Sequence, residues 1–387
     1  MAAYLLRRSL QSIITFLVFL TLVFFLVQAQ PGDFTSFYVL DPKVTPESRE
    51  AIRESFGLAK PVWQQYLIYV KNFFRGDFGV SFTQYPKPVL SVLVERLPRT
   101  ALLFVTATVV SFYAGFALGK VIAWSRGKAV EYISTVGGVY LYTIFTPWLA
   151  LVLIWLFAFR LGWFPVSKFI DPDLWVNATV DANLVFNLLI LTAGVLLATV
   201  GLATFLLRLR QGRWRWPQSD ALLLVVGLGF LGFIVLAWGL SGIGHLALDI
   251  VGHMVLPVLT LTLISFAGTM LLTRASMLET LREDYVLAAR AKGLSERAVR
   301  DRHAARNALL PVVTSFVFSL AFAIDGSVII ETIFSWPGMG LTLVQSVQSE
   351  DLPLAVGAFV FTGLLALFAH LVADLLYLFL DPRVQRR

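Results

Sequence analysis

One uncharged run of twenty residues decides the fold class: Met254-Val-Leu-Pro-Val-Leu-Thr-Leu-Thr-Leu-Ile-Ser-Phe-Ala-Gly-Thr-Met-Leu-Leu-Thr273. About 20 apolar residues in an α-helix cross the hydrocarbon core of a bilayer, so this run has the length and composition of a transmembrane helix. Seven more runs share these properties, and the eight together cover residues 9–28, 101–124, 133–158, 184–207, 221–240, 254–273, 309–330 and 355–380. Such single segments satisfy their backbone hydrogen bonds only as helices, so the sequence predicts an all-α polytopic membrane protein with eight spans.

The composition agrees with a membrane protein and excludes several kinds of site. The chain is 58% hydrophobic and only 14% charged, whereas a soluble domain carries about 25% charged residues. It has no cysteine and four scattered histidines, so we expect neither a disulfide, nor a metal centre, nor a cofactor held by this chain. We attribute the net charge of +7 to a basic cytoplasmic face and expect no nucleic-acid partner.

The distribution of basic residues predicts the orientation in the membrane. If the N-terminus is cytoplasmic, the cytoplasmic segments hold nineteen Lys and Arg residues, and the three short external loops hold only Arg160 and Lys168. By the positive-inside rule, both termini are then cytoplasmic. Arg7 and Arg8 precede the apolar run 9–28, which is long for a signal peptide, so we interpret it as a retained first helix.

This orientation divides the chain into five parts. Residues 1–29 contain the first helix, 30–98 an extracytoplasmic loop domain, 99–170 core helices, 171–250 an inserted transmembrane hairpin, and 251–387 further core helices with a cytoplasmic loop at 274–308. The hairpin helices 184–207 and 221–240 either both span or both do not. If only one spanned, the eight basic residues of the loop 274–306 would lie outside, against the positive-inside rule.

An amphipathic segment lies within the external loop. Along residues 61–74, one helical face collects Trp63, Tyr66, Leu67, Val70 and Phe74. Such a helix lies at the membrane interface in contact with lipid, docks a partner, or packs on its own domain. We take Trp63 and Tyr66 as the candidate docking residues.

The cytoplasmic loop contains the most informative stretch, Glu283-Asp-Tyr-Val-Leu-Ala-Ala-Arg-Ala-Lys-Gly-Leu-Ser-Glu-Arg-Ala-Val-Arg-Asp-Arg-His-Ala-Ala-Arg-Asn-Ala-Leu-Leu-Pro311. It has strong helical propensity and one break, at Gly293. The small residues Ala288 and Ala289 would let another protein approach the helix closely, and the glycine provides the backbone freedom for a turn.

This loop resembles the coupling loop of permease subunits in ATP-binding-cassette (ABC) importers, specifically the first-permease (B-type) subunit of the oligopeptide/dipeptide (peptide/nickel) branch. Other segments similar to that branch, in the same order, are Phe56-Gly-Leu-Ala-Lys-Pro, Arg75-Gly-Asp-Phe-Gly-Val-Ser, Thr273-Arg-Ala-Ser-Met-Leu-Glu, Glu331-Thr-Ile-Phe-Ser-Trp-Pro-Gly-Met-Gly and Leu380-Asp-Pro-Arg-Val. The resemblance lapses over about 171–250. Leu287 stands where the broader importer family has Glu, so no salt bridge is expected from that position.

The resemblance implies a core of six helices plus the hairpin, and a role in transport without catalysis. A short helix around residues 288–294 would sit in a cleft of an ATPase subunit and move as a rigid body, switching the pore between inward and outward openings. The implied coupling residues are Ala288, Ala289, Arg290, Lys292, Gly293 and Leu294. The implied partners are a second similar permease, two ATP-binding subunits that hold ATP and Mg, and an extracytoplasmic solute-binding protein, in the cell membrane of a prokaryote.

Two features of the sequence bear on this interpretation. No G-x-x-x-x-G-K-[ST] phosphate loop occurs, and the nearest match, Gly115-Phe-Ala-Leu-Gly-Lys120, lies inside a predicted span, so the ATPase is expected on other chains. The cargo is expected to be a peptide-like small solute, although related systems also carry nickel and oligosaccharides. Asp325 is the candidate residue for the translocation path, because charged residues within spans usually face a cavity or a partner.

Two alternative functions follow from other residues. A proton-coupled secondary transporter would use His370 and Asp374, which lie four apart on one helical face, or Asp325, as a proton relay. An intramembrane serine protease is suggested by Gly239-Leu-Ser-Gly242 with His245 and His253, but Ser241 falls at the mouth of a helix rather than at the base of a cavity.

Overall fold

The computed structural model describes residues 2–29, 60–210, 219–323 and 326–380. Within these ranges the regular secondary structure is helical, with a single isolated β-bridge between Val80 and Pro88. The all-α prediction is therefore confirmed for this part of the chain. The elements are α1 (Ala2–Gln28), α4 (Val62–Phe74), α5 (Val89–Trp124), α6 (Ala129–Thr143), α7 (Thr146–Leu153), η1 (Ile154–Arg160), α8 (Pro172–Trp175), α9 (Ala182–Arg210), α10 (Ser219–Leu240), α11 (Gly244–Thr280), α12 (Asp284–Ala291), α13 (Glu296–Ala298), η2 (Val299–Ala304), α14 (Ala305–Phe322), α15 (Val328–Ile333), α16 (Met339–Gln348) and α17 (Leu352–Leu380).

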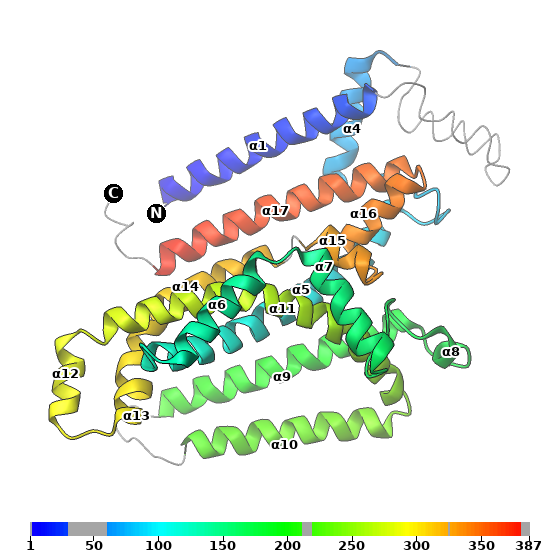
Figure 1. The fold of residues 1–387 in the computed structure, drawn as a ribbon. Coiled ribbons are helices and arrows are strands. Elements are labelled where there is room, and N and C mark those ends of the chain that lie inside the picture. Colours follow the sequence, from blue (N-terminus) through cyan, green and yellow to red (C-terminus); the bar gives the residue numbers. More distant parts are fainter. Residues whose placement is uncertain (1, 30–59, 211–218, 324–325, 381–387) are drawn as a thin grey trace. The chain divides into compact units, whose positions relative to one another are not determined.

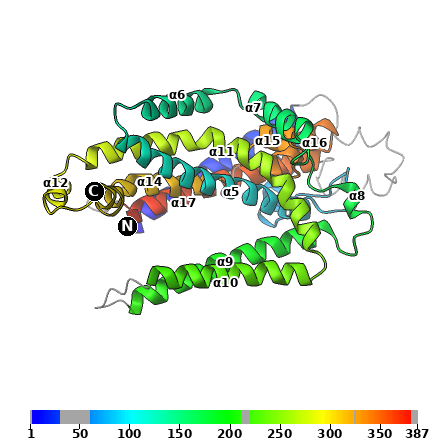
Figure 2. The same cartoon turned by 60° about the horizontal axis from the view of Figure 1, so that its bottom comes forward.

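The chain forms two compact units: unit 1 comprises Met1–Leu153 and Pro257–Arg387, and unit 2 comprises Ile154–Leu256. Within unit 1, α17 lies between α1 and α14, while α12 and α16 lie at opposite ends of the long helices (Figure 1). Figure 2 shows the same separation of α12 from α16 after rotation. Phe16, Leu20 and Val23 of α1 bury their side chains against Val360 of α17, which joins the first and last helices of the chain.

Helices α5 and α11 of unit 1 cross with their backbones in close approach. A Cβ atom on Gly115 would lie 2.6 Å from the carbonyl oxygen of Phe266, and one on Gly119 would lie 2.5 Å from Cβ of Thr273. Small residues spaced four apart allow this kind of contact between membrane helices. The segment that weakly resembles a phosphate loop is therefore a helix-packing motif.

Two of the predicted spans differ from the observed helices. The run 133–158 is divided between α6 and the α7–η1 pair, which meet at 105°. The break falls at Ile144 and Phe145, and α7 begins directly after it with Pro147 in its first turn, where the missing proline N–H costs no helical hydrogen bond. The run 309–330 is also interrupted, since α14 ends at Phe322 and Val328 begins the separate helix α15.

Among the described residues, six helices are long and apolar enough to cross a membrane, or seven if the bent pair is one span. The polytopic class is therefore supported, and the count of eight stays a prediction.

Unit 2 contains the residues predicted to form the inserted hairpin. Helices α9 and α10 run side by side (Figure 2). Both helices expose large apolar side chains, such as Leu197 and Phe233. The loop before α9 is held to the start of α11 by Asp249, whose Oδ2 accepts from the Asp171 backbone N–H at 3.0 Å and from Trp175 Nε1 at 2.8 Å. Both contacts fix the entry into the hairpin without placing a charge on its apolar faces.

Candidate functional site

The loop 274–308, which we call the coupling loop, folds into a short helix, a turn and a second helical segment. Helix α12 ends at Ala291, and Gly293 follows in the left-handed conformation with φ of +74° and its N–H donating to the Arg290 carbonyl at 2.9 Å. Ser295 then caps the next segment by accepting from the Ala298 N–H at 3.3 Å. The predicted break at Gly293 is present, but the short helix lies at 284–291 rather than 288–294, so Lys292, Gly293 and Leu294 belong to the turn.

The inner side of the coupling loop packs against three long helices. Val286 and Ala289 of α12 are buried with Val299 of η2 and Ala123 of α5. The same cluster includes Met277 of α11 and three alanines at the start of the following helical segment, Ala304, Ala305 and Ala308. Ser276 Oγ also donates to the Ala308 carbonyl at 2.9 Å. Helix α12 therefore shares one buried apolar cluster with residues of α5, α11 and α14.

The outer side of α12 presents a mixed face of apolar and small residues. Tyr285 and Leu287 are exposed, and so is Ala288, whereas Ala289 is only 5% exposed. The Arg290 side chain has intramolecular partners: its guanidinium carbon lies 5.7 Å from the Trp124 ring centroid, and its Nε lies 3.6 Å from Glu296 Oε1. Of the two adjacent alanines predicted to contact a partner, only Ala288 is exposed, and Tyr285 and Leu287 are exposed on the same helix.

At the opposite end of unit 1, the carboxylate of Glu331 joins α5, α15 and α16. Glu331 is fully buried, and its oxygens accept from Thr100 Oγ1 at 2.7 Å and from the Leu341 N–H at 3.0 Å. Thr100 Oγ1 in turn accepts from the Met339 N–H at 2.8 Å. We call this arrangement the Glu331 cluster. A buried carboxyl group needs such hydrogen-bond partners, and here they come from segments far apart in the sequence.

Other residues of the segment 331–340 also contact α5. Trp336 is fully buried and its Nε1 donates to the Arg99 carbonyl at 3.1 Å. A Cβ atom on Gly338 would lie 2.4 Å from Thr100 Oγ1 and 2.5 Å from Glu331 Oε1, so only glycine fits there. The segment 331–340 therefore attaches α15 and α16 to α5 through buried hydrogen bonds.

A cleft of about 660 Å³ opens along α5, α11 and α14 of unit 1. Its walls are aromatic and hydroxyl-bearing, without a charged side chain among the lining residues. The hydroxyl residues are Thr108, Ser111, Ser265, Thr269, Thr314, Ser315 and Ser319. Phe112 and Phe316 stack at one side with ring centroids 4.3 Å apart. These serine and threonine residues, which lie within long apolar helices, are the sequence signal for the cleft, but their spacing along the chain does not show that they share one face.

Helix α4 exposes only part of the face predicted from the sequence. Trp63 is 62% exposed, and Leu67 is exposed beside it. Tyr66 instead packs edge-on against Phe24 of α1, with its hydroxyl 2.8 Å from Thr21 Oγ1. The predicted face is therefore divided, with Trp63 outward and Tyr66 attached to the first helix.

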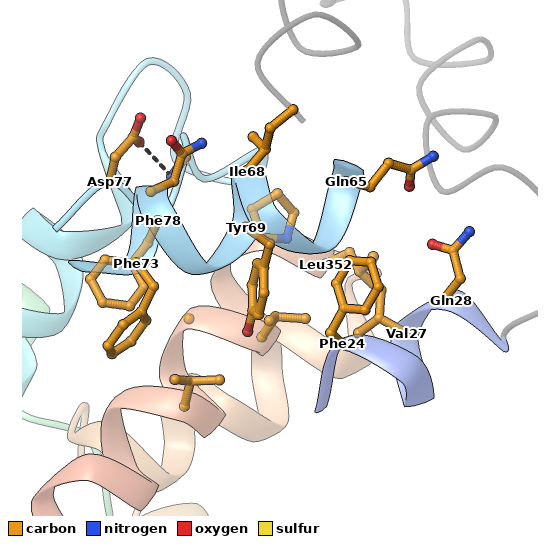
Figure 3. Close-up of a pocket in the computed structure, with 16 residues that line it drawn as sticks. Phe24, Val27, Gln28, Gln65, Ile68, Tyr69, Phe73, Asp77, Phe78 and Leu352 are labelled. Atoms are coloured by element: carbon orange, nitrogen blue, oxygen red, sulfur yellow. Dashed lines mark hydrogen bonds between the residues drawn. The ribbon is translucent and has the colours of Figure 1, made fainter. Parts of the chain in front are cut away.

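A small apolar pocket of about 90 Å³ lies beneath α4, between α1 and α17 (Figure 3). Tyr69 reaches from α4 into this space, and its buried hydroxyl has no hydrogen-bond partner among the described residues. Burial, with a smaller contribution from Tyr66, raises the pKa of the Tyr69 hydroxyl above its usual range. The Tyr69 hydroxyl is therefore neutral, and Asp77 is the one acidic residue among those that line the pocket.

The intramembrane polar residues of α17 are engaged in structural contacts. Asp374 Oδ2 lies 3.5 Å from Arg8 Nε of α1, and His370 Nδ1 lies 2.7 Å from the Ala366 carbonyl oxygen. These contacts fit helix pairing better than a proton relay. Asp325, the predicted path residue, lies outside the described residues.

The protease-like segment has different contacts from those of a catalytic serine. Ser241 Oγ donates to the Trp238 carbonyl at 2.7 Å, as an ordinary helix-end serine does. His253 Nδ1 lies 2.8 Å from the Asp249 carbonyl oxygen and 3.3 Å from its Oδ1. Each of these contacts is local to its own helix, so among the described residues no base is placed against the serine hydroxyl.

The long apolar helices, the packed coupling loop and the hydroxyl-lined cleft define a polytopic membrane transport subunit. The model of the binding-protein-dependent transport system inner membrane component matches residues 221–386, and that of the N-terminal membrane component of the same systems matches residues 1–104. The chain belongs to this family of binding-protein-dependent inner membrane components and is a permease subunit of an ABC importer, of the first-permease type.

Curated relatives align over the whole chain. The chain is 30% identical over 385 residues to the oligopeptide transport system permease protein AppB of Bacillus subtilis. It is 30% identical over 387 residues to the dipeptide transport system permease protein DppB of Escherichia coli, and 31% identical over 391 residues to the di/tripeptide transport system permease protein DppB of Pseudomonas aeruginosa. Each alignment covers 100% of both proteins, including the segment where the motif resemblance lapses.

Proposed function

We propose that this permease imports short peptides, by alternating access driven by separate ATPase subunits. The observation that carries the proposal is the geometry of α12, whose inner face is packed into α5, α11 and α14 while its outer face is exposed. The peptide cargo follows from the relatives, three of which are named for oligopeptide, dipeptide or di/tripeptide transport. The proton-coupled alternative is not favoured, because it explains neither this loop nor the family.

The exposed side of α12 and the turn after it are the proposed contact with an ATPase. Ala288 lets the partner approach closely, while Tyr285, Leu287 and Leu294 offer apolar contact. Lys292 is exposed in the turn and suits an acidic group on the partner. Ala289, Arg290 and Gly293 then serve by holding the shape of the coupling loop. Two ATPase subunits, which bind ATP and Mg, engage this chain and a second, similar permease.

The cleft along α5, α11 and α14 is the proposed half of the translocation path, and the second permease would supply the other half. Hydroxyl groups exchange hydrogen bonds with peptide N–H and C=O groups irrespective of the side chains that the peptide carries. A wall without charge also avoids tight binding to any one peptide. Ala323 lines the cleft, and Asp325 follows two residues later, so we keep Asp325 as a proposed path residue.

The extracytoplasmic binding protein is proposed to dock over α4. Trp63 and Leu67 give an exposed apolar surface there, and exposed tryptophans are enriched among residues that dominate binding energy. Tyr66, which was predicted with Trp63, contributes by anchoring α4 to α1.

The cargo and the energy source are tested together by uptake into proteoliposomes that contain the complete transporter. Uptake of radiolabelled trialanine should need both ATP and the binding protein, and should continue after a protonophore collapses the proton gradient. Uptake that stops with the protonophore and ignores ATP would favour the secondary transporter. Uptake of nickel or an oligosaccharide, with none of the peptide, would replace the proposed cargo.

The inserted hairpin is proposed to be a peripheral pair of transmembrane helices whose connecting loop is cytoplasmic, as are both termini. Its exposed apolar faces suit lipid, and the connecting sequence Arg208-Leu-Arg-Gln-Gly-Arg-Trp-Arg-Trp suits anionic headgroups. The chain has no cysteine, so single cysteines report topology directly. In intact cells, an impermeant maleimide should label Asp173→Cys and should leave Gln211→Cys unmodified until the cytoplasmic side is opened. Labelling of Gln211→Cys from outside contradicts the hairpin.

A further inference from the structure

A polar cavity of about 450 Å³ lies at the end of unit 1 that carries α16. Its walls come from the loop before α5, from α5 itself and from α16, through Thr83, Gln84, Arg96, Thr342, Ser346 and Ser349. The cavity differs from the cleft along α5, α11 and α14, because its lining is mainly polar and includes a guanidinium. The proposed orientation makes this end extracytoplasmic, where cargo arrives.

Arg96 is the one charged residue among those that line the cavity. Its Nε is buried and makes no hydrogen bond to a described residue. Glu95, the neighbouring carboxylate, accepts from Lys87 Nζ at 2.7 Å and from Arg99 at 3.1 Å. Asp351 is buried and accepts four hydrogen bonds at Oδ2 alone, from the side chains and backbone of residues 81–83. Both nearby carboxylates thus have other donors, and Arg96 keeps donor capacity for an anionic ligand.

The hydroxyls around the cavity restrict the ligand further. Thr83 donates its proton to Asp351 Oδ2 at 2.7 Å, and Thr342 donates to the Gly338 carbonyl at 2.7 Å. Ser346 and Ser349 donate to the carbonyls of Leu343 and Gln345 at 2.9 and 2.7 Å. Each hydroxyl has one proton, so toward the cavity these four groups can only accept. These four acceptors suit a ligand that carries hydrogen-bond donors as well as a negative charge, and the amides of Gln84, Gln345 and Gln348, which also line the cavity, can donate or accept.

We propose that this cavity binds the carboxyl-terminal end of the transported peptide, with Arg96 pairing with the α-carboxylate and the hydroxyl oxygens accepting from the peptide N–H groups. The inference rests on the proposed peptide cargo. A free peptide terminus combines an anion with adjacent amide donors in a volume of this size. An acidic side chain of the docked binding protein supplies the anion without the adjacent donors. Arg96 lies two turns before Phe104 on α5, so the site stands just ahead of the hydroxyl-lined cleft.

The test compares trialanine with its carboxyl-terminal amide in the reconstituted transporter. Each peptide is delivered as a preformed complex with the binding protein, and transport rates are compared at equal concentrations of loaded binding protein. The wild-type rate should be about tenfold or more higher for the free acid, in line with a hydrogen bond to a charged group. Arg96→Gln should lower the acid rate to the amide rate and leave the amide rate unchanged. Arg96→Lys, which keeps the charge, should retain part of the preference.

Two control variants separate the carboxylate site from other roles. Arg75→Gln removes an exposed cation at the end of α4 and should change neither rate. Trp63→Ala should weaken docking of the loaded binding protein, whereas Arg96→Gln should leave that affinity as it is. If Arg96→Gln slows both peptides equally, or weakens docking, the carboxylate site is wrong and the peptide cargo stands. If the wild-type transporter carries neither peptide, the proposed cargo is wrong and this inference falls with it.

Discussion

Gly338→Ala should destabilise the protein by about 3 kcal/mol, at the upper end of what overpacking a buried position costs. The added methyl group would stand 2.4 Å from Thr100 Oγ1 and 2.5 Å from Glu331 Oε1. It can fit only if these two atoms separate, and they are themselves joined by a 2.7 Å hydrogen bond. Glu331 is fully buried, so its carboxylate would lose a donor where water cannot replace it.

The measurement is the midpoint of thermal unfolding in detergent, followed by size-exclusion chromatography of the heated protein. Gly268→Ala is the matched control, because a Cβ atom at Gly268 of α11 meets nothing within 4 Å. That variant should be unchanged or slightly more stable, since alanine favours a helix by about 1 kcal/mol over glycine. An equal midpoint for Gly338→Ala and wild type would mean that the Glu331 cluster does not hold α15 and α16 to α5.

Gly293→Pro should reduce the ATPase stimulation caused by loaded binding protein to nearly the basal level. Gly293 has φ of +74° and donates its N–H to the Arg290 carbonyl. Proline fixes φ near −65° and has no N–H, a combination that costs about 3 kcal/mol or more when the backbone needs both. The turn must therefore refold, and Lys292 and Leu294 leave their positions beside α12.

The control for this prediction is Gly293→Asn, because asparagine tolerates the left-handed conformation and keeps its N–H. That variant should retain most of the stimulation. Basal ATPase activity and the yield of assembled complex, measured for both variants, separate uncoupling from failure to assemble. Wild-type stimulation in Gly293→Pro would contradict the proposed role of the turn in coupling.

Local signals in the sequence were sufficient for the elements that depend on them. Uncharged apolar runs predicted the long helices, since a bilayer leaves few alternatives to a helix for such runs. The amphipathic pattern of 61–74 predicted α4, and the isolated Gly293 predicted the turn in the coupling loop. The bend between α6 and α7 also had a local signal in Pro147, which the run of apolar residues around it concealed.

The remaining features depend on contacts between segments distant in the sequence. Ala288 and Ala289 are the same residue type, so the sequence does not distinguish them. Ala289 is the buried one because it packs in the cluster that contains Val299 and Met277. The sequence shows Glu331 only as an acidic residue at the end of a predicted span. Its hydrogen-bond partner Thr100 lies 231 positions away, so the sequence does not indicate the pair. Likewise, the sequence shows serine and threonine on three helices but not that they face one cleft.

Helix α5 has a further consequence for how the two ends of unit 1 behave. It is 36 residues long, about 54 Å at 1.5 Å per residue, and it is continuous from the Glu331 cluster, through Thr100, to the packed interior of the coupling loop, through Ala123. An intact helix does not stretch or shorten appreciably, so the Glu331 cluster and the coupling loop are joined by one stiff element. A tilt of α5 at the coupling loop would therefore also displace its end at the Glu331 cluster. Pro98 lies inside the helix and has no backbone N–H, so the missing hydrogen bond permits local bending there. The two ends of unit 1 are joined by one continuous helix, so we expect a movement at one end to be accompanied by a movement at the other.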